Sequence, residues 1–80
     1  MPTVTRIKGY RFFFFSREES EPPHIHIEHA EKYAKFWLNP VSLVWNVGFH
    51  GHELTELRRL IEKNKSLFQE KWHEYFKHKG

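Results

Sequence analysis

Hydrophobic and polar side chains alternate just before the middle of the chain, as they do in a β-strand that is buried on one face. Ile25 and Ile27 fall on one side of such a strand, and His24, His26 and Glu28 fall on the other. The pattern predicts that the isoleucines enter the core. It also predicts that the two imidazoles and the carboxylate are presented together, within reach of solvent.

The remaining periodicities predict three further strands and two helices. The expected strands cover residues 3–8, 10–16, 24–29 and 33–38, and the expected helices run from about 52 to 63 and from Asn64 or Ser66 onward. Residues 41–47 fit either a short helix or a packed loop. The chain is therefore expected to be one α+β domain over residues 1–80, with a small antiparallel four-stranded sheet (about 3–38) followed by two C-terminal helices (about 52–78) packed on one face.

The aromatic run from Tyr10 to Phe15 does not alternate. Continuous apolar character is typical of a strand covered on both faces, whereas two helices of one small domain usually cover a single face. We therefore expect a second copy of the chain or another protein to cover the far face, which makes a homo-oligomer one of the expected assemblies.

Composition narrows the class of protein. The 80 residues include eight Phe, three Tyr and three Trp but no cysteine, so the core must be built largely from rings without a disulfide. The formal net charge of +3 is mild, and no block of like charge resembles a nucleic-acid-binding tail. No signal peptide or membrane-spanning stretch is visible, which predicts a cytoplasmic protein without a membrane partner.

His24 and His26 are the strongest candidates for chemistry. Two imidazoles with pKa values near neutrality suit general acid–base cleavage of a phosphodiester, with Lys35, Arg11 or Arg17 stabilising the phosphate charge. As metal ligands, the same histidines would be completed by Glu28 or His73. A third interpretation makes both rings surface residues or contacts to a partner, because a His-x-His motif is weak. Acid–base chemistry would need no cofactor.

The histidines nearer the C-terminus are weaker candidates for a chemical site. His50 and His52 flank a helix start, where positive charge opposes the helix dipole, so a loop and cap are expected there. His73 lies at the edge of the aromatic stripe formed by Phe68, Trp72 and Phe76; it would either fold back toward the sheet or pair with a neighbour on its own helix.

Several segments together resemble a known family of small bacterial proteins, domain of unknown function 4160. They are Met1-Pro2-Thr3-Val4, Tyr10 to Phe15, Pro22-Pro23-His24-Ile25-His26, Ala34-Lys35-Phe36-Trp37-Leu38, Gly48-Phe49, Glu53-Leu54 and Trp72-His73-Glu74-Tyr75-Phe76. Members commonly start the first helix with a capping Ser-Pro-x-Glu, where this chain has His50-Gly51-His52-Glu53, which predicts a weaker cap.

The resemblance implies a bacterial cytosolic protein that is the toxin of a toxin–antitoxin pair, with a small antitoxin encoded beside it. We expect at most a metal-independent ribonuclease, in which His24 and His26 exchange protons and Lys35 holds the phosphate. His73 or Tyr75 would orient the RNA. The alternatives are a non-catalytic protein-binding module and a small histidine-based metal-binding domain.

Overall fold

The computed structural model describes residues 3–15 and 20–77. Its elements, in chain order, are β1 (Thr3–Ile7), β2 (Tyr10–Phe13), β3 (His24–His29), β4 (Lys32–Leu38), β5 (Val41–Val47), α1 (Gly51–Lys63) and α2 (Lys65–Lys77). The molecule measures 38 × 22 × 20 Å along its principal axes. None of the described helices is long and apolar enough to cross a membrane.

The strands form one antiparallel sheet in the order β1-β2-β3-β4-β5. The α+β class with an antiparallel sheet and two helices is confirmed, but the sheet has five strands and the prediction of four is wrong. The missing strand is β5, at residues 41–47, where a short helix or loop was expected. A register shift opposite Lys35 and Phe36 breaks its alternation, so the sequence shows neither a clean strand period nor a helix period there.

Tight turns connect β1 to β2, β3 to β4 and β4 to β5. Lys8 and Gly9 have φ angles of 53° and 86° in the β1–β2 turn, which is the backbone of a two-residue hairpin loop with both central residues at positive φ. Ala30 lies in the turn between β3 and β4 and has a φ of 55°. Asn39 and Pro40 end β4 and form the short connection to β5.

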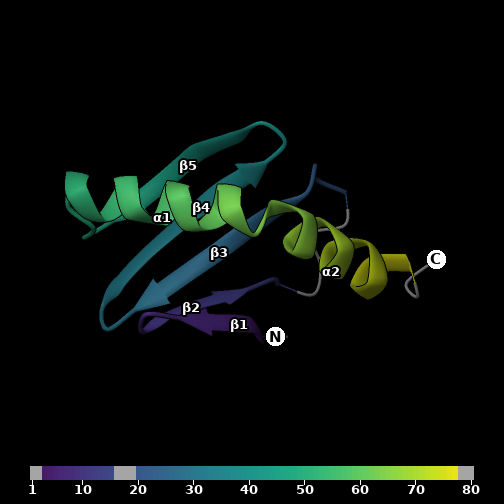
Figure 1. The fold of residues 1–80 in the computed structure, drawn as a ribbon, viewed down its shortest axis with the longest axis horizontal. Coiled ribbons are helices and arrows are strands. Elements are labelled where there is room, and N and C mark those ends of the chain that lie inside the picture. Colours follow the sequence, from purple (N-terminus) through teal and green to yellow (C-terminus); the bar gives the residue numbers. More distant parts are fainter. Residues whose placement is uncertain (1–2, 16–19, 78–80) are drawn as a thin grey trace.

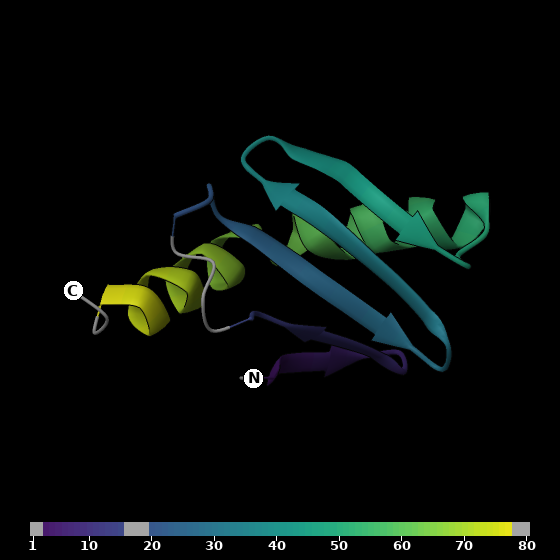
Figure 2. The ribbon, with the colours of Figure 1, turned by 180° about the vertical axis from the view of Figure 1, so that it is seen from behind.

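Both helices lie on the same face of the sheet (Figure 1), and no helix crosses the opposite face (Figure 2). We call these the covered face and the helix-free face. On the covered face the buried side chains of β2, β3 and β4 meet those of α1 and α2. This core comprises Tyr10, Phe12, Phe14, Ile25, Ile27, Ala34, Phe36, Leu38, Phe49, Leu57, Leu60, Ile61, Phe68 and Trp72.

The aromatic run is buried on both faces, as its composition predicted, but the far face is covered differently from the prediction. Phe12 stacks on Phe68 of α2 at a ring-centroid distance of 5.3 Å. Phe13 points to the helix-free face, yet it is only 1% exposed. Its ring is covered by side chains of this same chain, including the Arg11 guanidinium at 4.3 Å. Burial of Phe13 therefore requires no second copy.

Candidate functional site

The two histidines of β3 lie opposite the isoleucines, as the alternation predicted. Ile25 and Ile27 belong to the core under the helices, whereas His24 and His26 point to the helix-free face. Their exposure differs from the prediction: His24 is 0% exposed and His26 is 2% exposed. The expectation that both rings are within reach of solvent is therefore wrong. The physical reason is that aromatic side chains from other elements enclose them.

His26 sits in a cluster of rings. It stacks on Phe13 with ring centroids 5.4 Å apart, and it meets the edge of Phe15 at 4.5 Å. The Tyr33 hydroxyl lies 3.5 Å from Nδ1 of His26. The centroid of the Trp45 ring lies 6.4 Å from the centroid of the same imidazole. These contacts replace water over most of the imidazole, so His26 forms part of an aromatic wall.

His24 occupies the end of β3 that lies nearest α2. Its Nδ1 lies 3.0 Å from the carbonyl oxygen of Pro22, and a carbonyl can only accept, so this nitrogen carries the proton. Trp72 and Trp37 enclose the ring at centroid distances of 4.9 Å and 5.8 Å. The His26 ring lies 5.0 Å away. The fold thus brings the two histidines together, but the indoles of Trp37 and Trp72 cover the His24 ring.

Lys35 is buried beside this pair and is held by a carboxylate that the sequence analysis missed. Its Nζ donates to Oε1 of Glu21 at 2.7 Å, and the same oxygen lies 3.7 Å from Nδ1 of His24. The ammonium also lies 5.1 Å from the Trp37 ring centroid. We call Glu21, His24 and Lys35 the Glu21 cluster. The signal that could have revealed Glu21 is the rule that a buried lysine needs a partner.

Arg11 forms hydrogen bonds within the sheet and covers Phe13 on the helix-free face, so its guanidinium is not available to a substrate. Its Nη1 donates to Oε1 of Glu28 at 3.1 Å, and its Nε donates to Oγ1 of Thr3 at 2.9 Å. Glu28 is therefore engaged away from the histidine pair. Among residues 3–15 and 20–77, no three His, Cys, Asp or Glu side chains are grouped as metal ligands, and His24, His26 and Glu28 do not form the set that the alternative required.

The remaining predicted site residues are not gathered at the histidine pair. His73 is exposed on α2 and makes no hydrogen bond, ion pair or ring contact within the described part of the chain. Tyr75 is half-buried, and its ring centroid lies 6.4 Å from that of Phe14. It belongs to the aromatic face predicted for this helix. Arg17 lies outside the described residues.

Apolar side chains remain exposed along β5. Leu43 is 39% exposed, Trp45 is 41% exposed and Val47 is 58% exposed. Trp45 stacks on Tyr33 with centroids 5.0 Å apart and ring planes within 7°, so one face of its indole is covered and the other is available. This surface was missed because residues 41–47 were not recognised as a strand.

The start of α1 ties the helix to the sheet. Glu53 accepts a hydrogen bond from the backbone N–H of His50 at 2.9 Å and from Nζ of Lys32 in β4 at 2.6 Å. The backbone hydrogen bond is the main reason, and the Lys32 bond the second, that the pKa of Glu53 is lowered from 4.5 to about 2. The expected loop and cap at His50 are confirmed. Glu53 supports the cap that lacks a serine.

Comparisons with known proteins identify one family. A family model described as a domain of unknown function (DUF4160) matches residues 9–73, which include β2 to β5, α1 and most of α2. No curated protein and no solved structure matches the chain.

Proposed function

The chain belongs to the DUF4160 family of domains of unknown function, and we propose that it is a protein-binding module, the toxin component of a bacterial toxin–antitoxin pair. One observation carries the binding part of this proposal. Four large hydrophobic side chains are exposed among the described residues, and three of them, Leu43, Trp45 and Val47, belong to β5. The three lie along one edge strand, although Leu43 faces the helices and Trp45 faces the other side, and exposed apolar side chains gathered in this way are typical of an interaction site.

The burial of the histidines supports binding over catalysis. A general acid or base must come within hydrogen-bonding distance of the group whose proton it moves, and His24 and His26 are 0% and 2% exposed. Trp45, by contrast, presents one indole face next to the wall that contains His26. Aromatic anchors of this kind contribute most of the binding free energy at protein interfaces.

The binding test uses the purified chain and the purified product of the gene that neighbours its own. We expect a stable complex in size-exclusion chromatography with light scattering. The double variant Trp45→Arg, Val47→Glu should abolish the complex, because it places charges on the apolar surface. The matched control is Leu67→Glu, since Leu67 is 38% exposed but lies on α2. Absence of a complex with the wild-type chain contradicts the proposal.

The toxin part of the proposal has a separate test. Induced expression of this chain alone should arrest bacterial growth, and expression of the neighbouring gene in the same cells should restore it. Unchanged growth in both strains contradicts the toxin assignment, and the complex measured with purified proteins then stands as a separate result.

Metal-independent RNA cleavage is the second candidate function. The Glu21 cluster favours it, because the His24 imidazole and the Lys35 ammonium lie 3.7 Å and 2.7 Å from the same carboxylate oxygen of Glu21. Cleavage would require the ring wall to open. RNA incubated with the chain in the presence of a chelator should be cut by the wild type and left intact by His24→Ala, His26→Ala. Equal cleavage by both proteins removes the two rings from the mechanism.

A further inference from the structure

The two edges of the sheet differ in how they are protected. Edge strands expose backbone N–H and C=O groups, and proteins usually blunt them with charges, short length or irregular pairing. β1 is five residues long and carries Arg6, whereas an irregular register occurs at both edges, between β1 and β2 and between β4 and β5. β5 is seven residues long and contains no charged residue and no proline. The β5 edge is therefore the one that remains suited to pairing with another strand.

The bulge in β5 places apolar side chains on both faces at this edge. In a regular strand, residues two apart share a face. Here the register shift pairs Leu43 with Phe36 of the covered face, and Trp45 with Lys35 of the helix-free face. An added strand also directs alternate side chains to the two faces, so it would find an apolar contact on each. Bulges often re-aim side chains in this way at functional positions.

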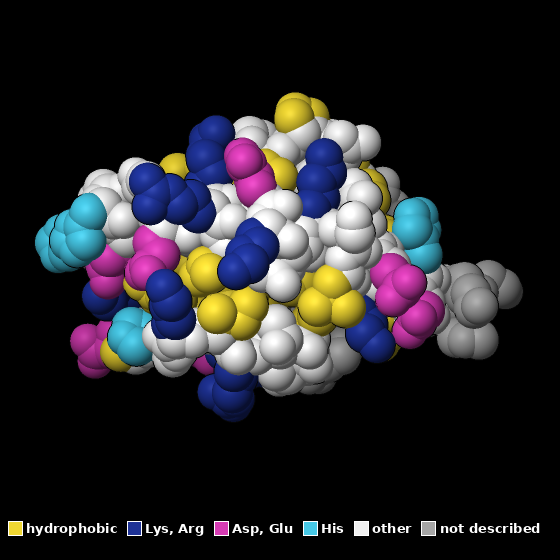
Figure 3. Space-filling model, viewed as in Figure 1, with side chains coloured by type: hydrophobic (Ala, Val, Ile, Leu, Met, Phe, Trp, Pro, Cys, Tyr) yellow, Lys and Arg dark blue, Asp and Glu magenta, His cyan; other side chains and the backbone are white. Residues whose placement is uncertain are grey.

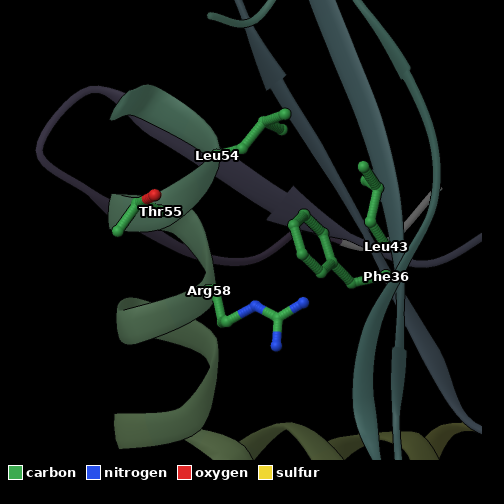
Figure 4. A pocket seen from close by; sticks show the side chains of 5 residues that line it. All are labelled: Phe36, Leu43, Leu54, Thr55 and Arg58. Carbon is green, nitrogen blue, oxygen red and sulfur yellow. The ribbon is translucent and has the colours of Figure 1, made fainter. Parts of the chain in front are cut away.

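A hollow lies next to the edge on the covered face. It has a volume of about 210 Å³ and is lined by Phe36, Leu43, Leu54, Thr55 and Arg58 (Figure 4). This volume is below the roughly 300–1,000 Å³ of small-molecule sites, and it suits a single inserted side chain. The hollow is lined from both α1 and β5, so its lining reaches the edge at which a strand would be added.

The positive charge of Arg58 beside the hollow favours a partner that carries an acidic side chain. Arg58 extends from α1 toward Phe36 (Figure 4), and within the described part of the chain it forms no hydrogen bond or ion pair, including none with Glu62 one turn further along α1. The other acidic residues of α1 are occupied, Glu53 by Lys32 and Glu56 by Lys8. Lys and Arg side chains are prominent on this side of the molecule (Figure 3).

We propose that β5 binds an extended internal segment of a protein partner by strand addition. The segment places an apolar side chain in the hollow between α1 and β5, and an Asp or Glu side chain on Arg58. Main-chain hydrogen bonds supply the affinity in this mode, and pockets for alternate side chains supply specificity. An internal segment is favoured over a chain end because β5 continues past the hollow. The inference rests on the proposed protein-binding function and specifies its site.

The test selects a displayed library of random peptides against the full chain. We expect enriched peptides to combine apolar residues in alternation with an Asp or Glu, without proline at the centre. In fluorescence anisotropy, Arg58→Glu should weaken a selected peptide by about tenfold or more, since a charge-assisted contact is replaced by repulsion. The matched control, Arg59→Glu, changes the same charge on a residue that does not line the hollow, and it should retain affinity.

A second measurement tests the strand geometry. Methylation of the peptide's backbone amides one at a time should weaken binding at alternate positions only, because every second amide faces β5. The inference is overturned if no acidic pattern is enriched, if Arg59→Glu acts as strongly as Arg58→Glu, or if the chain proves to be a dimer closed through β5. A complex with the neighbouring gene product that Arg58→Glu leaves intact removes this site but keeps the proposed function.

Discussion

The side chains at the centre of both faces of the sheet are buried from solvent, but they are buried in different ways. On the covered face, Phe12 and Ile25 are each 0% exposed under two helices. On the helix-free face, Phe13 and His26 reach 1% and 2% exposure through rings and an arginine of the sheet itself. Burial on an open face is thus achieved by aromatic side chains lying against one another, without a second layer.

The two faces also differ in their polarity. The buried side chains of the covered core are all apolar or aromatic, whereas the buried polar residues of the described chain, His24, His26 and Lys35, belong to the helix-free wall. No buried side-chain nitrogen or oxygen in the described residues lacks a hydrogen-bond partner. The covered face therefore acts as the core, and the helix-free face holds the groups that carry specificity.

The largest effect is expected on the covered face. Phe12→Ala should reduce the free energy of unfolding by about 3–5 kcal/mol, because it removes a fully buried ring that stacks on Phe68 and leaves a cavity. Urea denaturation followed by tryptophan fluorescence measures the loss. A loss below about 1 kcal/mol would mean that the helices do not close this face.

A smaller effect is expected for the ring wall. His26→Ala should cost about 2–3 kcal/mol, since it opens a gap between Phe13, Phe15 and Tyr33. His26→Phe should stay within about 1.5 kcal/mol of the wild type, because it keeps a ring of similar shape. If the phenylalanine variant is as unstable as the alanine variant, the role of His26 lies in its nitrogens and not in its ring.

The Glu21 cluster is expected to have an effect of about 1–2 kcal/mol. Glu21→Gln leaves the buried Lys35 ammonium without its counter-charge, but partial exposure of Glu21 to solvent softens the cost. Lys35→Met should restore most of the stability in the Glu21→Gln background, because it removes the unpaired charge. The four proteins form a double-mutant cycle by urea denaturation; strictly additive losses would show that the pair is not coupled.

The loss of stability at acid pH tests the contacts of Glu53, which join the start of α1 to Lys32 of β4. The folded-state pKa of Glu53 is lowered from 4.5 to about 2, so its contribution is complete above pH 4.5 and is lost as the pH falls through about 2. Glu53→Gln should therefore be less stable than the wild type at pH 7. The difference should close between about pH 4.5 and 2 in urea titrations. A difference that stays constant over that range contradicts the assigned ion pair.

Local patterns predicted much of the fold. The two sides of β3 and the stripe of α1 follow from side-chain periodicity, which is a property of neighbouring residues. β5 could not be predicted in this way, because its bulge depends on the register with β4. The sequence also placed His24 beside His26, but it could not show that Trp72, more than forty residues later, would cover one of them.

Glu21 illustrates the same limit. It lies in a polar segment before two prolines, which predicts a loop and nothing more. Its role follows only from the fold, which brings it to a lysine on the middle of β4. Residues whose partners are distant in sequence, such as Glu21 and Trp45, were the ones that sequence analysis could not assign.

Hydrogen–deuterium exchange of the chain, alone and with the product of the neighbouring gene, tests the account most directly. Docking at β5 predicts new protection of amides in residues 41–47 and in the part of α1 that faces them, while the centre of β3 stays protected in both samples. Protection confined to β1 or α2, or no change anywhere on adding the partner, would contradict the assignment of β5 as the binding edge.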